Sequence, residues 1–151
     1  MADGEQAAEP GAGLVNLDRG GTGGLVVTSA AAAVAPDALA VVHVALSLAL
    51  FVIGTGALLW AYALGISRSR TDLVSISGLF LLASPAAPAP TRRAFYLALA
   101  VQVIAVVVAA SVRPFSEVAF GILAPMYGLG LMALWGARYG EFPPRPMREA
   151  S

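Results

Sequence analysis

The sequence contains no cysteine, no lysine and a single histidine, and only 12% of its residues are charged. The absence of cysteine excludes disulfides, iron-sulfur ligation, zinc thiolate sites and a thiol nucleophile. Nine arginines balance nine acidic residues, so the net charge gives no reason to expect nucleic acid as a partner. Paired carboxylates, histidine clusters and a serine with a nearby base are also missing from the pattern. We therefore expect no enzymatic activity, no metal and no cofactor.

Hydrophobic residues are abundant instead: they make up 58% of the chain, and the mean hydropathy is +0.79. This composition is typical of an integral membrane protein rather than of a soluble domain. Apolar segments of about 20 residues are long enough to cross a bilayer as helices. The sequence predicts an all-α membrane protein with a membrane domain over residues 37–140 and three transmembrane helices, at residues 38–66, 94–112 and 118–137.

The regions outside these spans are less regular. Residues 1–36 begin with acidic residues, continue through a glycine-rich stretch and end in a short apolar run, so we expect a flexible N-terminal tail. Residues 141–151 contain three prolines and predict a C-terminal tail. Residues 73–83 are apolar but too short to span, which favours a short interfacial or re-entrant helix and leaves the choice between the two open.

The arginines indicate an orientation, because positive residues near membrane ends are retained in the cytoplasm. With three spans, one face receives two arginines, Arg19 and Arg113. The other face receives seven: Arg68, Arg70, Arg92, Arg93, Arg138, Arg145 and Arg148. We therefore expect a multi-pass protein of the bacterial inner membrane with the C-terminus in the cytoplasm and the N-terminus outside.

Four polar residues near or within the spans are candidates for function: His43, Gln102, Arg113 and Glu117. His43 lies near the outer end of the first span, where we expect it to meet water rather than to bind a metal. Gln102 lies near the middle of its span and should bond to another helix, with Thr55 and Tyr127 as the partners considered. Glu117 follows Arg113 by four residues and is placed to neutralise it. A path for a transported species, lined by Gln102, His43 or Glu117, remains the alternative.

Small residues recur at helical spacing in the first and third spans, and such positions allow close helix contact. The spacing does not tell whether the contacts are made within the chain, between copies or with a larger partner. The positions are Ala57, Ala61, Gly65, Gly128 and Gly136.

The second half of the chain carries the segments Arg113-Pro114-Phe115, Met126-Tyr127-Gly128-Leu129-Gly130 and Trp135-Gly136-Ala137-Arg138-Tyr139-Gly140-Glu141-Phe142-Pro143-Pro144-Arg145. In these segments it resembles small uncharacterised integral membrane proteins of actinobacteria. The resemblance covers about the last two thirds of the chain. It implies a helical membrane fold in a bacterial envelope, and it carries no activity onto individual positions.

These observations lead to two hypotheses about function. The first is an accessory or scaffolding subunit that packs in the lipid bilayer against another membrane protein or against copies of itself, because packing faces are present without a catalytic constellation. The second is a small transporter or channel formed by a homo-oligomer, because three spans with few polar groups do not enclose a water path alone. A membrane enzyme is the least favoured class. The ligand, the partner and the oligomeric state are not indicated by the sequence.

Overall fold

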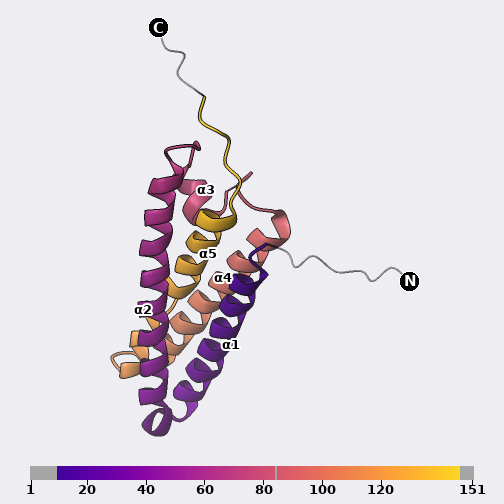
Figure 1. Ribbon diagram of the computed structural model, residues 1–151. Coiled ribbons are helices and arrows are strands. Elements are labelled where there is room, and N and C mark those ends of the chain that lie inside the picture. Colours follow the sequence, from indigo (N-terminus) through magenta and orange to yellow (C-terminus); the bar gives the residue numbers. More distant parts are fainter. Residues whose placement is uncertain (1–9, 84, 147–151) are drawn as a thin grey trace, which may run out of the picture.

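The computed structural model describes residues 10–83 and 85–146, without the side chains of residues 36–38. Its elements are all helices, which confirms the all-α fold (Figure 1). In chain order they are α1 (Ala12–Val34), α2 (Pro36–Arg68), α3 (Ile76–Leu81), α4 (Ala89–Val112), the 3₁₀ helix η1 (Glu117–Leu123) and α5 (Met126–Tyr139).

Within the described residues, three segments are long and apolar enough to cross a membrane, as predicted. They are Leu39–Arg68, Ala89–Val112 and Glu117–Tyr139. The second begins five residues before the predicted boundary because prolines are tolerated in the first turn of a helix, where the missing N–H has no intrahelical partner. The third is interrupted at Pro125, where η1 gives way to α5.

Residues 12–34 correct the prediction of a flexible tail, because they form the helix α1, which packs against α2, α4 and α5. Five residues on one face of α1 are buried at helical spacing: Asp18, Thr22, Leu25, Ser29 and Ala32. The helix is about 35 Å long at 1.5 Å per residue, close to the lengths of the spans Ala89–Val112 and Glu117–Tyr139. Its glycines and its polar residues lower its hydropathy, which is why it does not stand out as a span in the sequence.

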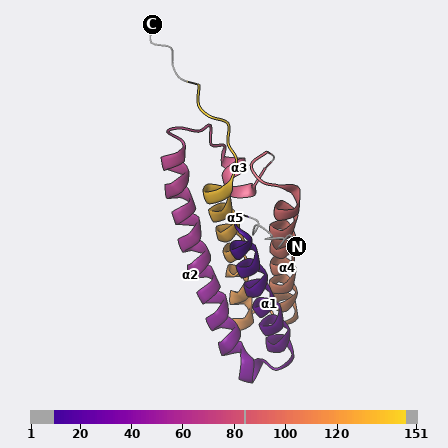
Figure 2. The same ribbon diagram turned by 45° about the vertical axis from the view of Figure 1, so that its right-hand side comes forward.

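The four long helices form a bundle in which α1 and α4 run in one direction, whereas α2 and the η1–α5 segment run in the other (Figures 1 and 2). Gly11, just before α1, lies against the rings of Trp135 and Tyr139 near the end of α5. The beginning of α1 and the end of α5 therefore lie at the same end of the bundle. α1 therefore runs along the bundle beside the three candidate spans.

The predicted small-residue positions make contacts within the chain. On the seam between α2 and α5, a β-carbon on Gly130 would overlap the carbonyl oxygen of Gly54, so the two backbones touch. Ala61 on α2 is fully buried in a cluster with Ala133 and Ala137 of α5. The other predicted positions also pack inside: Ala57 on the main core, Gly65 on Leu79, Gly128 on Gln102 and Gly136 on the backbone of Leu79.

The segment 73–83 contains only one short helix, α3, which begins after Ser75, whose hydroxyl accepts a hydrogen bond from the backbone N–H of Gly78 at 3.0 Å. Leu79 and Leu82 are buried, and Leu79 packs into the gap left by Gly65 and Gly136. The segment therefore closes one end of the bundle, with Ile76 exposed and Leu79 turned inward.

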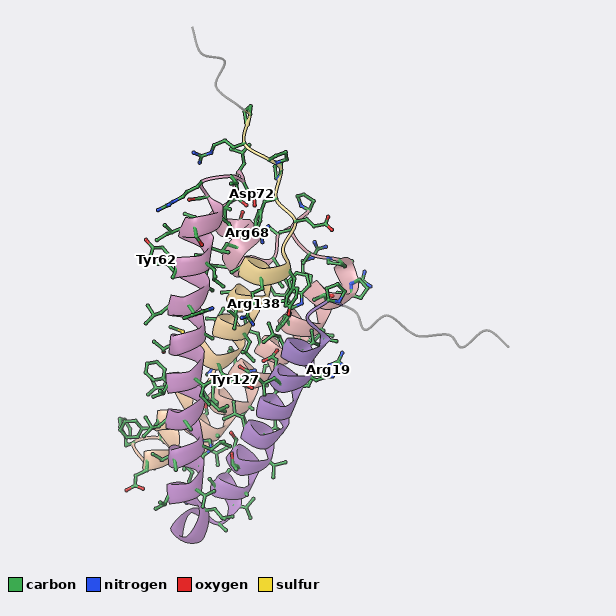
Figure 3. All side chains as sticks on the ribbon, in the orientation of Figure 1. Arg19, Tyr62, Arg68, Asp72, Tyr127 and Arg138 are labelled. Atoms are coloured by element: carbon green, nitrogen blue, oxygen red, sulfur yellow. The ribbon has the colours of Figure 1, made fainter. Side chains whose placement is uncertain are left out.

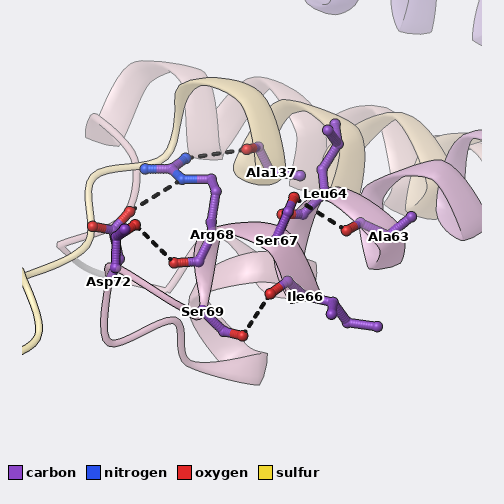
Figure 4. Close-up of polar contacts among 9 residues, drawn as sticks. Ala63, Leu64, Ile66, Ser67, Arg68, Ser69, Asp72 and Ala137 are labelled. Carbon is purple, nitrogen blue, oxygen red and sulfur yellow. Dashed lines mark hydrogen bonds and ion pairs between the residues drawn. The ribbon is translucent and has the colours of Figure 1, made fainter.

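Residues 141–146 are held at the same end rather than extending as a free tail. The Leu73 N–H donates to the Pro143 carbonyl at 2.8 Å, and the Arg145 N–H donates to the Thr71 carbonyl at 2.8 Å. Arg68 donates to the Asp72 carboxylate at 3.3 Å and to the Ala137 carbonyl at 3.1 Å (Figure 4). A cation at the C-terminal end of α5 compensates the helix dipole, which stabilises this junction.

Candidate functional site

A group of polar side chains lies in the interior of the bundle between α1, α4 and α5. The Gln102 amide nitrogen on α4 donates to the Asp18 carboxylate at 3.1 Å and to the Thr22 hydroxyl at 2.7 Å, both on α1. Asp18 and Gln102 are each only 1% exposed. The Tyr127 hydroxyl of α5 donates to the Leu17 carbonyl at 2.8 Å, and Figure 3 shows this tyrosine at the centre of the bundle. We call Asp18, Thr22, Gln102 and Tyr127 the first polar cluster.

Two glycines make room for the first polar cluster. A β-carbon on Gly21 would overlap the Tyr127 ring, so this glycine lets the tyrosine cross the face of α1 to reach the Leu17 carbonyl. A β-carbon on Gly128 would lie 2.8 Å from the Gln102 side-chain oxygen, so α5 leaves space for the amide. That oxygen is buried and has no hydrogen-bond partner among the described residues, which leaves an acceptor in the interior.

A second group of polar side chains lies farther along α1, where this helix meets α2. The Nδ1 atom of His43 lies 3.4 Å from the Thr28 hydroxyl, and His43 and Ser47 are fully buried. The imidazole Nε2 packs against Gly121 of η1, where a β-carbon would lie 2.6 Å away. Within the described part of the chain, the His43 Nε2 atom and the Ser29 and Ser47 hydroxyls have no partner. We call Thr28, Ser29, His43 and Ser47 the second polar cluster.

Leu25 separates the two clusters and is itself fully buried. From Thr22 to Ser29 the distance along α1 is about 10 Å at 1.5 Å per residue. The same face of α1 therefore presents polar, apolar and polar side chains in turn to the interior. Polar groups at membrane depth normally face protein interior, find partners and mark functional positions.

The structure changes the surroundings expected for two of the predicted site residues. Gln102 forms hydrogen bonds to another helix, as the sequence predicts. Its partners are Asp18 and Thr22 rather than Thr55 or Tyr127. The sequence predicts that His43 meets water, and this prediction is wrong: the side chain is buried because α1 covers that face of α2.

The predicted ion pair between Arg113 and Glu117 does not form. The Arg113 Nε atom donates to the Ala33 carbonyl at 3.2 Å, at the C-terminal end of α1. There the cation satisfies a free carbonyl and opposes the helix dipole. Glu117 is exposed at the start of η1. Neither residue joins the polar clusters.

Sequence reasoning misses Asp18 and Thr22 because it predicts a flexible tail for the segment that carries them. A signal is present: residues 18, 22, 25, 29 and 32 follow the spacing of one helix face, and all are buried. Glycines between them mask this pattern, because glycine weakens a helix prediction.

Among residues 10–83 and 85–146, no group of three or more histidine or acidic side chains is arranged to hold a metal ion. The site is instead a set of hydrogen-bonding groups that includes the ionisable side chains of Asp18 and His43. No known protein family, curated protein or solved structure matches this chain.

Proposed function

We propose that the chain is a multi-pass protein of a bacterial inner membrane and that its four-helix bundle carries protons through the two polar clusters. The observation that carries this proposal is the Asp18 carboxyl group, which lies in the bundle interior, 1% exposed, and bonds to Gln102. A carboxyl group inside a membrane protein is costly and is retained chiefly where it serves ion or proton movement.

The proposed orientation uses α1 as a fourth crossing. Arg19 then joins the seven arginines already assigned to one face, and Arg113 alone remains on the other. The positive-inside rule places the arginine-rich end, with both chain termini, in the cytoplasm. This arrangement also removes the need to export the N-terminal segment.

The packing of the interior favours protons over larger species. Leu25, Phe95 and Val106 are each at most 1% exposed and belong with Tyr127 to the main core cluster of the bundle. An ion or a solute needs a continuous lumen, whereas a proton needs only donors and acceptors that water can link. In this proposal Asp18 and His43 take up and release the proton in turn. Leu25 separates the two clusters, so water must enter beside Leu25 to connect these side chains.

The test uses purified protein in lipid vesicles that contain a pH-sensitive dye, with a potassium gradient and valinomycin to drive protons. We expect the protein to raise proton flux over protein-free vesicles, and Asp18→Asn to lower that flux at least tenfold. Asparagine can still accept the hydrogen bond from Gln102, so the variant should fold. Asp72→Asn is the matched control, because Asp72 lies at the end of the bundle (Figure 3). Equal flux from Asp18→Asn and wild type would refute the proposal.

An accessory or scaffolding subunit is the second candidate. The specific observation in its favour is the open space beside three glycines of α1: a β-carbon added at Gly13, Gly20 or Gly23 would have no neighbour within 4 Å among the described residues. Such outward glycines weaken a helix, and they allow a partner helix to approach closely. Mild-detergent purification should then recover a membrane partner in stoichiometric amount, and Gly20→Leu should abolish the recovery. Recovery of the chain alone would count against this candidate.

A further inference from the structure

Another polar region lies outside the two clusters, at the end of the bundle where α1 and α4 begin and α5 ends. It consists of two adjacent cavities that share Pro90 and Thr91. The first cavity has a volume of about 160 Å³ and is also lined by Trp135, Tyr139 and Glu141. The second has a volume of about 150 Å³ and is also lined by Asn16 and Arg19. We call them the aromatic cavity and the arginine cavity.

The aromatic cavity has the chemistry of an ammonium site. The ring centroids of Trp135 and Tyr139 lie 5.8 Å apart, and Glu141 belongs to the same lining. Aromatic rings and a carboxylate together attract a compact cation. The indole N–H of Trp135 is buried and has no partner among the described residues, and the side chain is only 3% exposed.

The arginine cavity has the opposite preference. Arg19 is exposed on α1 and projects away from the bundle axis (Figure 3). The Asn16 amide and the Thr91 hydroxyl add neutral donors, and the described residues of the lining include no acidic side chain. A guanidinium with neighbouring donors is suited to a phosphate group. Two neighbouring cavities thus prefer groups of opposite charge, as a zwitterion provides.

A separate apolar groove lies farther along the same two helices, α1 and α4. It has a volume of about 340 Å³ and is lined by residues that include Val26, Ala30 and Ala33 on α1, and Val101 and Ile104 on α4. Residues 12, 16, 19, 26, 30 and 33 follow the spacing of one face of α1. From Arg19 to Val26, where the groove begins, the rise along α1 is about 10 Å, which is within one leaflet of a hydrocarbon core of about 30 Å. The groove is therefore placed for an acyl chain.

We propose that the two cavities and the groove, which together we call the lipid seam, bind one phospholipid with a zwitterionic headgroup that carries an ammonium group. Its phosphate lies in the arginine cavity against Arg19 and Thr91. Its ammonium group lies in the aromatic cavity against Glu141 and the Trp135–Tyr139 pair, and one acyl chain lies in the groove between α1 and α4. Charge complementarity at two adjacent cavities distinguishes this ligand from an anionic lipid.

The experiment is native mass spectrometry of the full-length protein in detergent, titrated separately with phosphatidylethanolamine and phosphatidylglycerol. We expect one phosphatidylethanolamine per chain, retained at least fivefold better than phosphatidylglycerol. Glu141→Gln should remove this preference, and Arg19→Gln should weaken retention of both lipids about tenfold. Glu117→Gln and Arg70→Gln are the matched controls, because both residues are exposed and lie outside the lipid seam.

A third variant separates the headgroup from the groove. Ala30→Phe should fill the groove and lower retention of both lipids without changing the preference between them. Better retention of phosphatidylglycerol by the wild type would overturn the proposal, since the lipid seam would then be an anionic-lipid site. An unchanged preference in Glu141→Gln would overturn it as well, because the carboxylate would then have no part in recognition.

Discussion

Replacing Gly130 by alanine should destabilise the bundle, whereas the same replacement at Gly56 should not. At Gly130 the added β-carbon would overlap the Gly54 carbonyl oxygen and lie 2.7 Å from the Gly54 carbonyl carbon. At Gly56 the added carbon would have no neighbour within 4 Å in the part of the chain that the structure describes. Both substitutions put the same methyl group into a helix, so the difference between them reports the close contact of α2 and α5.

The magnitude follows from the geometry. Carbon atoms in favourable contact lie about 3.5–4.0 Å apart, so α2 and α5 must separate by roughly 1 Å. Overpacking of this kind costs about 1–3 kcal/mol, and the obstacle is backbone, which has no alternative rotamer. Alanine returns about 0.5–1 kcal/mol relative to glycine within a helix. We expect a net loss of about 1–2 kcal/mol at Gly130 and a gain of about 0.5–1 kcal/mol at Gly56.

The assay is equilibrium unfolding in mixed micelles with increasing sodium dodecyl sulfate, followed by far-ultraviolet circular dichroism. The free energies of unfolding of Gly130→Ala, Gly56→Ala and wild type are compared under one set of conditions. Reversibility and coincident transitions from two probes justify the two-state treatment. If both variants shifted the free energy in the same direction by similar amounts, the close packing of α2 on α5 would be refuted.

Three further predictions concern polar contacts. Gln102→Leu should lower the free energy of unfolding by about 1–3 kcal/mol and expose α1 to limited proteolysis, because the buried Asp18 carboxyl group loses its donor; an unchanged digestion pattern would contradict this. Arg113→Gln should lower the melting temperature through loss of about 0.5–1 kcal/mol at the end of α1, and Glu117→Gln, the control, should leave it unchanged. Arg68→Met should speed hydrogen exchange at the Arg145 amide, because the junction of residues 71–73 with 143–145 loses the Arg68 contacts; exchange at the wild-type rate would argue against that coupling.

The sequence is sufficient to predict the three apolar spans, because length and hydropathy alone decide whether a helix can cross a bilayer. It is not sufficient to predict α1. Glycines at positions 20, 21, 23 and 24 reduce the local helix propensity, and the helix is stabilised by its contacts with α2, α4 and α5, which are distant in the sequence. Tertiary packing overrides local preference in this segment.

The candidate site, too, can be predicted from the sequence only in part. Gln102 can be identified from the sequence because a polar side chain in an apolar span needs a partner. The identity of that partner depends on α1, so Asp18 cannot be assigned without the structure. The burial of His43 likewise depends on which face of α2 is covered by α1. Small residues in the first and third spans indicate close helix contact, whereas the pairing of Gly54 with Gly130 can be identified only from the structure.

The most direct test determines on which side of the membrane α1 begins. The chain has no cysteine, so single cysteines at Gly13, Phe115 and Pro146 can be labelled with a membrane-impermeant reagent on an otherwise unreactive background. All three positions are exposed. If α1 crosses with the other helices, Gly13→Cys and Pro146→Cys will react from the cytoplasmic side and Phe115→Cys from the opposite side. Reaction of Gly13→Cys from the same side as Phe115→Cys would contradict the four-helix bundle and the buried position of Asp18.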